Sequence, residues 1–219
     1  MGQAQKYGKN RPRFEYRKIH FGVHLGATTS NFHYRLKQGF DNPDSIAKVS
    51  IRSAPGLAFQ MPLISWNPKY TFNLRFHPSI SFHEAYFDYA YRKNDILEQR
   101  EYRWEATNLN FPIQFKLNTK RLHNFGAYAL GGFQYSRNLV DQNKVQQTPN
   151  NPIVKTNPND FAFNVGGGFD FFLPYFKFGL ELKLVSGVRN VLVQDNTFFT
   201  NPLESLRTRS FWISFTFEG

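Results

Sequence analysis

Large apolar residues occupy every second position in one stretch of this chain after another, and the residues between them are small, polar or charged. The clearest stretch, residues 70–82, has its large apolar side chains at Tyr70, Phe72, Leu74, Phe76, Ile80 and Phe82. Because successive side chains of a β-strand point to opposite faces, a period of two predicts strands with one apolar and one polar face. The pattern recurs about eight times, which predicts an all-β fold.

The connections between these stretches alternate in length. The predicted strands are residues 19–26, 57–63, 70–86, 108–117, 125–137, 161–171, 176–184 and 211–217. The long, polar connections are Leu36–Ser53, Asp88–Glu101, Asn138–Asn159 and Val188–Ser205, and the links between them are short. Short periplasmic turns and long extracellular loops are typical of outer-membrane barrels. We therefore expect a single eight-stranded antiparallel up-and-down transmembrane β-barrel in the bacterial outer membrane.

Alternation alone does not decide which face lies inside the barrel. A soluble lipocalin-like barrel would place the aromatic face inside, and a membrane barrel would place it outside. The interior of an eight-stranded barrel is just wide enough for side chains. A chain with 25 Phe and 11 Tyr would overfill it with the aromatic face inward, whereas the Gly, Ser and Asn of the other face would fit. We therefore favour the membrane barrel with a lumen filled by polar side chains, and keep the soluble barrel as the alternative.

Composition excludes several classes of protein. The 219 residues contain no Cys, which rules out disulfides, Cys-zinc sites and cysteine nucleophiles. The formal charge is +11, but the aromatic residues follow the strand period and match no nucleic-acid-binding consensus, so we expect no nucleic acid partner. No apolar signal segment follows Met1, so we expect the chain to begin near a mature terminus, after removal of a signal peptide.

Part of the excess positive charge lies at the start of the chain. The basic residues of this region are Lys6, Lys9, Arg11, Arg13, Arg17 and Lys18. Two interpretations remain open: a solvated tail, or attraction to anionic lipid, lipopolysaccharide or an acidic partner. We divide the chain into a basic, flexible periplasmic arm over residues 1–16 and the barrel over residues 17–219.

Charged residues also fall on the face assigned to the lumen. They are Arg75, Lys116, Asp170, Glu181 and Lys183, with Arg103, Glu105, Arg207 and Arg209 expected in the lumen towards the loop end. Isolated buried charge is very costly, so these residues are expected to pair with one another. The arrangement predicts an interior ion-pair plug, with a selective polar channel as the alternative. Arg207 and Arg209, near the loop end, are also candidate partner contacts.

Two motifs resemble catalytic or metal sites. His77 and Ser79 share a face, as a nucleophile and its base require. Both are expected in the lumen, however, whereas a lipid-cleaving site must face lipid. His20 and His24 share a face but lie roughly 13 Å apart along a strand, too far for one metal ion. The sequence therefore predicts no catalytic residues, no cofactor and no metal site.

Several segments resemble the PorT (also called SprT) proteins of the type IX secretion and gliding-motility system. They are Phe21–Gly26 with Asn31-Phe32, Leu74–Phe82, Asn110–Pro112 with Phe115-Lys116, Gly166–Phe178, and Leu203–Phe211 running into Phe215–Glu218. The more specific matches are Pro174–Phe178 and the C-terminal segment from Leu203–Arg209 to Phe215–Glu218. The resemblance implies a non-enzymatic outer-membrane barrel needed for protein export and gliding motility. We expect its partners to be outer-membrane lipid or lipopolysaccharide and other protein subunits of an outer-membrane secretion complex. It supplies no catalytic residues.

Two further functions stay open at the level of the sequence. One is an outer-membrane lipid-modifying enzyme that uses His77 and Ser79. The other is a structural or adhesion barrel whose loops bind a surface ligand.

Overall fold

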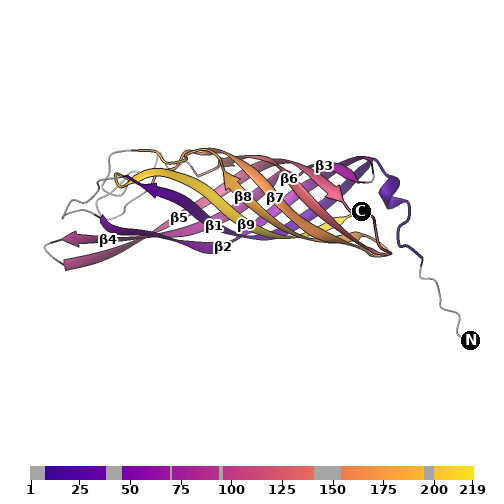
Figure 1. The fold of residues 1–219 in the computed structure, drawn as a ribbon, viewed down its shortest axis with the longest axis horizontal. Helices are drawn as coiled ribbons and strands as arrows, with labels where there is room; N and C mark the ends of the chain where they lie inside the picture. Colours follow the sequence, from indigo (N-terminus) through magenta and orange to yellow (C-terminus); the bar gives the residue numbers. More distant parts are fainter. Residues whose placement is uncertain (1–7, 38–45, 70, 94–95, 141–153, 195–199) are drawn as a thin grey trace, which may run out of the picture.

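The computed structural model describes residues 8–37, 46–69, 71–93, 96–140, 154–194 and 200–219 (Figure 1). After a short 3₁₀ turn, Phe14–Tyr16, all the elements of the described chain are strands. Their bounds are β1 Ile19–Leu36, β2 Ile46–Lys69, β3 Phe72–Phe76, β4 Ser79–Lys93, β5 Ile96–Asn118, β6 Phe125–Asn138, β7 Asn159–Phe172, β8 Lys177–Gly187 and β9 Leu203–Glu218. No helix in these ranges is long and apolar enough to cross a membrane.

The strands form a closed ring. Strand β1 pairs with β2 on one side and with β9 on the other, and each strand from β5 to β9 pairs antiparallel with the next. Strands β3 and β4 together fill one place between β2 and β5, and the break between them falls at His77 and Pro78. Proline cannot donate a backbone hydrogen bond to the ladder, which explains the interruption. The described strands thus occupy eight positions, and the predicted eight-stranded up-and-down topology is confirmed.

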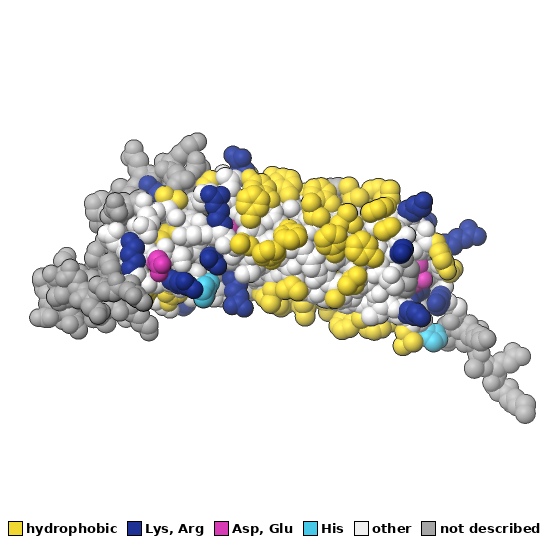
Figure 2. All heavy atoms as spheres, turned by 45° about the horizontal axis from the view of Figure 1, so that its top comes forward, with side chains coloured by type: hydrophobic (Ala, Val, Ile, Leu, Met, Phe, Trp, Pro, Cys, Tyr) yellow, Lys and Arg dark blue, Asp and Glu magenta, His cyan; other side chains and the backbone are white. Residues whose placement is uncertain are grey.

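The aromatic face points outward. Met61, Phe163 and Val165 are 65%, 52% and 61% exposed, although they lie in the middle of long strands. Figure 2 shows such side chains as a yellow band around the visible face of the barrel. In contrast, the polar Gln60 and Ser214 of the other face are fully buried. The aromatic face therefore lies outside the barrel and the polar face fills the lumen, as the narrow interior predicted.

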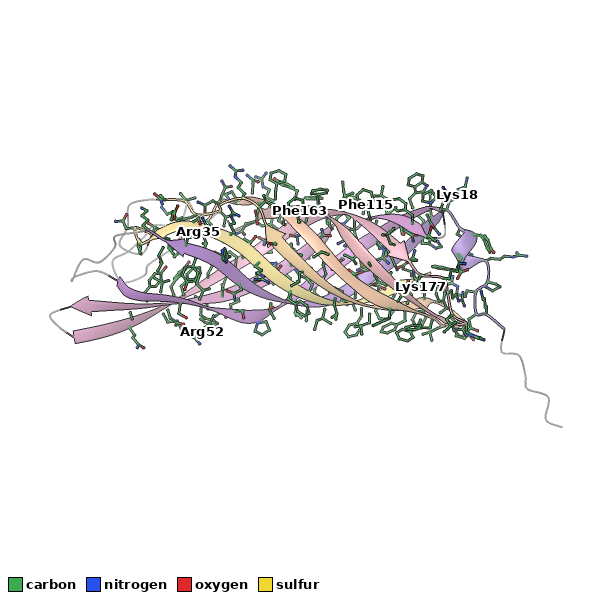
Figure 3. The ribbon with its side chains drawn as sticks, viewed as in Figure 1. Lys18, Arg35, Arg52, Phe115, Phe163 and Lys177 are labelled. Atoms are coloured by element: carbon green, nitrogen blue, oxygen red, sulfur yellow. The ribbon has the colours of Figure 1, made fainter. Side chains whose placement is uncertain are left out.

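Basic residues flank this apolar band at both ends (Figure 2). Lys18 lies at the end with the short turns, Arg35 and Arg52 lie at the other end, and Phe115 lies between them (Figure 3). An apolar belt about 25 Å tall between polar rims is the outer surface of a membrane barrel. Charged residues begin where lipid hydrocarbon would end.

The strands run further than predicted at the loop end. Asp88–Glu101, expected to be a loop, instead contains the end of β4 and the start of β5, and β2 begins at Ile46 rather than near Leu57. Pairing of β1 with β2 stops at Ser30 and Ala54, and pairing of β5 with β6 begins only at Asn108. Strands β2, β4 and β5 therefore project beyond the barrel wall as a three-stranded sheet, which we call the extension (Figure 1).

The two faces exchange polarity in the extension. Its inner face is apolar and packs against residues from β1, β9 and the described parts of the long connections. This cluster contains Phe32, Val49, Ala85, Phe87, Tyr89, Trp104, Ala106, Val154, Val191 and Leu206. The outer face of the extension is charged, with Arg52, Asp88 and Glu101 side by side. In the sequence, the many charged residues made the region around Asp88 and Glu101 resemble a polar loop. In the structure these charges lie on the outer face, and the apolar residues that alternate with them face inward.

The orientation of the faces predicts a depth-dependent cost for charge on the outer wall. Ile113 lies at the centre of the outward apolar run of β5 and is 50% exposed. We expect Ile113→Arg to lower the free energy of unfolding in lipid vesicles by about 2–4 kcal/mol, because the guanidinium would lie at the bilayer midplane. Urea titration of the folded barrel measures this difference.

A matched control lies on the same face of the same strand. Thr107→Arg places the same charge near the rim of the band, where a cost of only about 0–1 kcal/mol is expected. Equal destabilisation by the two variants would contradict a lipid-facing band.

Candidate functional site

The centre of the lumen holds a network of buried charges that link strands on opposite sides of the barrel. Arg75 on β3 donates through Nη1 to Oε2 of Glu181 on β8 and through Nη2 to Oε1 of Glu218 on β9, each over 2.9 Å. Arg75 and Glu181 are fully inaccessible to solvent, and Glu218 is 1% exposed. Since β3 is not a neighbour of β8 or β9 in the ring, these ion pairs cross the lumen.

A second group of ion pairs lies beside the first. Lys116 Nζ on β5 is 2.6 Å from Oδ2 of Asp170 on β7. Lys177 Nζ lies 3.5 Å from the same oxygen of Asp170 and 2.8 Å from Oε2 of Glu218. Asp170 and Glu218 are thus each shared between two cations, and the two groups form one continuous charge layer.

Two further side chains complete the charge layer. The Tyr128 hydroxyl donates to Glu181 over 3.0 Å, and its ring lies 3.5 Å from Lys116 Nζ. Lys183 is buried as well, and its ammonium lies 4.7 Å from the centroid of the Trp212 ring. Four buried cations (Arg75, Lys116, Lys177 and Lys183) therefore meet three carboxylates (Asp170, Glu181 and Glu218), an excess of one positive charge.

All five charged residues that the sequence assigned to the central lumen lie there. Arg75 contacts Glu181 and Lys116 contacts Asp170, while Lys183 faces an aromatic ring. The sequence analysis did not single out Lys177, Tyr128 or Glu218 as members of the layer. Strand parity carried the necessary signal for Glu218, because Trp212, Ser214 and Thr216 precede it on the same inward face.

Four residues expected in the lumen at the loop end are on the outside. Arg103 and Glu105 are 56% and 62% exposed, and Arg207 and Arg209 are exposed on β9. The prediction was wrong because the two-residue period is unbroken along both strands: odd-numbered positions from Arg103 to Leu117, and from Arg207 to Phe217, share the outer face. Arg207 and Arg209 do lie at the loop end, on the surface available to a partner.

His77 and Ser79 do not form a catalytic pair. Both face the lumen and are buried, as parity predicted. The Ser79 Oγ accepts a hydrogen bond from Asn110 Nδ2 over 3.2 Å, and the His77 ring stacks on His24 with centroids 5.2 Å apart. Neither ring nitrogen of His77 has a hydrogen-bond partner within the described residues.

The histidines do not assemble a metal site in the described ranges. His20 packs against Phe14 with ring centroids 4.1 Å apart, whereas His24 and His77 contact each other. Within those ranges, no group of three or more His, Asp or Glu side chains could hold a metal ion.

The charge layer separates two small cavities. The upper cavity, on the side of the long connections, has a volume of about 60 Å³ and is lined among others by Asn110, Val185 and Trp212. The lower one, about 30 Å³, is lined by Phe14, Lys177 and other residues near the short turns. Along β8, Glu181 and Lys183 lie between Lys177 and Val185, so the layer stands between the two cavities.

The described part of the N-terminal arm closes the short-turn end of the barrel. Phe14 is only 5% exposed and packs against His20 and Phe172. Asn10 Nδ2 donates to the backbone oxygen of Phe172 over 3.0 Å, and Arg121 Nη1 lies 3.6 Å from Glu15 Oε1. The sequence predicted a flexible arm over residues 1–16. Within the described residues, the segment from Asn10 to Tyr16 is docked on the barrel.

The outer face of the extension carries its own ion pairs, beyond the apolar band. Arg52 contacts both Asp88 and Glu101, and Arg103 lies 2.8 Å from both Glu84 and Glu105. Hydrogen bonding from Arg52 lowers the pKa of the Asp88 carboxyl. Arg52 and Arg103 are therefore already neutralised by carboxylates of the chain itself.

Comparisons with known proteins agree with this geometry. The model of the outer membrane protein beta-barrel domain family matches residues 3–193. The chain belongs to this family. It is therefore a protein of the bacterial outer membrane. In barrels of this kind the short turns face the periplasm. No curated protein sequence matches the chain at a significant level.

Solved structures of outer-membrane proteins have a similar fold. OprG from Pseudomonas aeruginosa is 11% identical, with 97% of each chain covered and a TM-score of 0.51. Neisserial surface protein A is 9% identical over 90% of this chain and 96% of that one, with a TM-score of 0.41. Ail of Yersinia pestis is 9% identical over 93% of this chain and 100% of that one, also with a TM-score of 0.41. At such identities, the likeness to OprG shows the fold alone.

The charge layer predicts a large cost for removing Arg75. We expect Arg75→Met to lower the free energy of unfolding in detergent micelles by about 3–5 kcal/mol, because Glu181 would keep a buried charge with the Tyr128 hydroxyl as its one remaining hydrogen-bond donor among the described residues. Glu218 would still pair with Lys177. Urea denaturation followed by gel mobility of the folded barrel measures this loss.

The double variant Arg75→Met with Glu181→Gln separates the charge effect from lost packing. It removes the orphaned carboxylate, so it should be more stable than Arg75→Met alone. The exposed Arg52→Gln serves as a control and should change the stability little. A double variant no more stable than the single one would show that the charge of Glu181 is not what the layer neutralises.

Proposed function

We propose that this outer-membrane barrel is a non-enzymatic, non-conducting subunit required for protein export by the type IX secretion system, and hence for gliding motility. The observation that carries the proposal is the charge layer, which leaves the lumen no role as a conduit for cargo. The pathway comes from the resemblance to the PorT proteins, which is most specific at Pro174–Phe178 and from Leu203 to Glu218.

A barrel with a filled lumen can act only through its wall and its two ends. At the periplasmic end, Lys9, Arg13, Arg17 and Lys18 are exposed around the docked Phe14. Docking of the arm fixes these cations near the membrane surface, where an acidic face of another subunit could bind them. We assign this end the contact with the periplasmic parts of the export complex.

The alternative of a lipid-modifying enzyme has little support in the site. Lipid cannot reach His77 and Ser79 through the wall, since both are buried on the lumen side. An adhesion barrel is the second candidate, favoured by the extension that projects beyond the apolar band. If the second candidate is correct, deletion of the gene should abolish adhesion and leave protein secretion normal.

The charge layer predicts that the purified barrel does not conduct. We expect no steady ion current across planar bilayers from the wild type or from Phe14→Ala, because the layer seals the lumen above Phe14. Steady conductance in Phe14→Ala alone would assign the seal to the arm, and conductance in the wild type would contradict a closed lumen.

The export role predicts a secretion defect in cells. Deletion of the gene should abolish export of cargo with the type IX sorting domain, and the wild-type gene should restore it. Replacing Lys9, Arg13, Arg17 and Lys18 with Gln should leave the barrel in the outer membrane but reduce export, because the periplasmic contact loses its charge. Immunoblots of culture medium and of outer-membrane fractions measure the two quantities.

Lys69→Gln with Lys120→Gln is the matched control, because both residues are exposed at the same end of the barrel but outside the arm. It should export normally. Normal secretion in the deletion strain would rule out the proposed function.

A further inference from the structure

A cluster of arginines lies on the outer face where β1 meets β9. His33 on β1 is directly opposite Arg207 on β9, and Asn31 is opposite Arg209. Arg35 follows two positions after His33 on the same face, diagonal to Arg207. Directly opposed Cβ atoms lie about 5 Å apart, and diagonal neighbours about 7–8 Å. Arg35, Arg207 and Arg209, all exposed, therefore form one compact cationic patch, which we call the seam cluster.

The seam cluster has no counter-charge from the described chain. Within the described residues, none of its three arginines forms an ion pair with a carboxylate. In contrast, each of Arg52 and Arg103 contacts two carboxylates on the extension. Like charges that share one small patch repel one another unless an anion lies between them. An external anion would therefore stabilise this part of the barrel.

The position of the seam cluster along the barrel axis, relative to the apolar band, indicates which anion it would meet. On the outer face of β9, Arg207 and Arg209 are followed at two-residue spacing by Phe211, Ile213 and Phe215, which belong to the apolar band. In Figure 3, Arg35 lies on the loop-end side of Phe163 and Phe115, which belong to the band. This places Arg35 at the loop-end margin. This margin faces the outer leaflet, so the guanidinium groups stand at the level of lipid headgroups, directly above the acyl chains.

We propose that the seam cluster binds the phosphate groups of lipopolysaccharide in the outer leaflet. Guanidinium groups donate in a planar fork that matches phosphate oxygens, and three forks within one patch can engage two phosphates of one glycolipid. The acyl chains of that molecule would lie along Phe211 and Ile213, which continue the same face into the band. The proposal is independent of the secretion role, since it concerns only the outer wall.

Lipid retention by the purified, folded barrel tests the proposal. Wild-type protein, refolded without lipid, is titrated in micelles with lipopolysaccharide, and binding is followed by native mass spectrometry. We expect Arg35→Gln with Arg207→Gln and Arg209→Gln to bind on the order of a hundredfold more weakly, at roughly fivefold per arginine. The matched control, Arg52→Gln with Arg103→Gln, removes arginines on the same side that already have carboxylate partners, and should bind like the wild type.

Two further measurements separate phosphate recognition from general effects. Lipopolysaccharide with its phosphates removed should bind the wild type as weakly as intact lipid binds the triple variant. Intact lipid should raise the melting temperature of the wild type but not of the triple variant, which without lipid should melt at the same temperature or higher. The single variant Arg207→Gln, with a partial loss, serves if the triple variant does not fold. Unchanged binding by the folded variants, or an equal loss in the control, overturns the proposal.

Discussion

The narrow interior of a barrel with eight strand positions is the constraint on which the rest of the structure depends. In lipid every backbone group of the wall must be paired, which requires closure, and closure at this size leaves room only for side chains. Charges inside such a lumen have no bulk water, so they must neutralise one another across it. The ion pairs from Arg75 to Glu181 and Glu218 meet that requirement and join walls that share no backbone hydrogen bonds.

Along single strands the outer face changes from apolar to charged, and this change marks the level at which the lipid hydrocarbon ends. On β4, Ile80 and Phe82 face outward and Ser81 inward, whereas further along Asp88 faces outward and Phe87 inward. One strand therefore faces lipid over part of its length and water over the rest, while its side chains keep the same two-residue period. Apolar side chains point away from water in the extension and away from the lumen in the membrane. The extension can thus hold its own apolar core beyond the bilayer.

Local alternation was enough to predict the topology, the outward aromatic face and the inward position of Arg75, Lys116 and Asp170. Two kinds of feature could not be read in the same way. The partner of Arg75 at Glu218 depends on which strands meet across the lumen, and the docking of Phe14 depends on a cavity that exists only after closure. The outward position of Arg207 was available from parity. It was missed because charge was taken as a sign of the lumen.

Some arginines of this barrel are paired with carboxylates of the same chain, and others lie exposed with no such partner among the described residues. Arg75 in the lumen and Arg52 on the extension each contact two carboxylates, so their hydrogen-bonding capacity is largely used. The seam cluster, marked by Arg35, and the cations around the arm, marked by Lys18, lie instead at the two ends of the barrel wall (Figure 3). A cation that the fold leaves exposed and unneutralised retains most of its interaction energy for a partner. The surfaces that act on other molecules are therefore expected at these two ends rather than in the lumen.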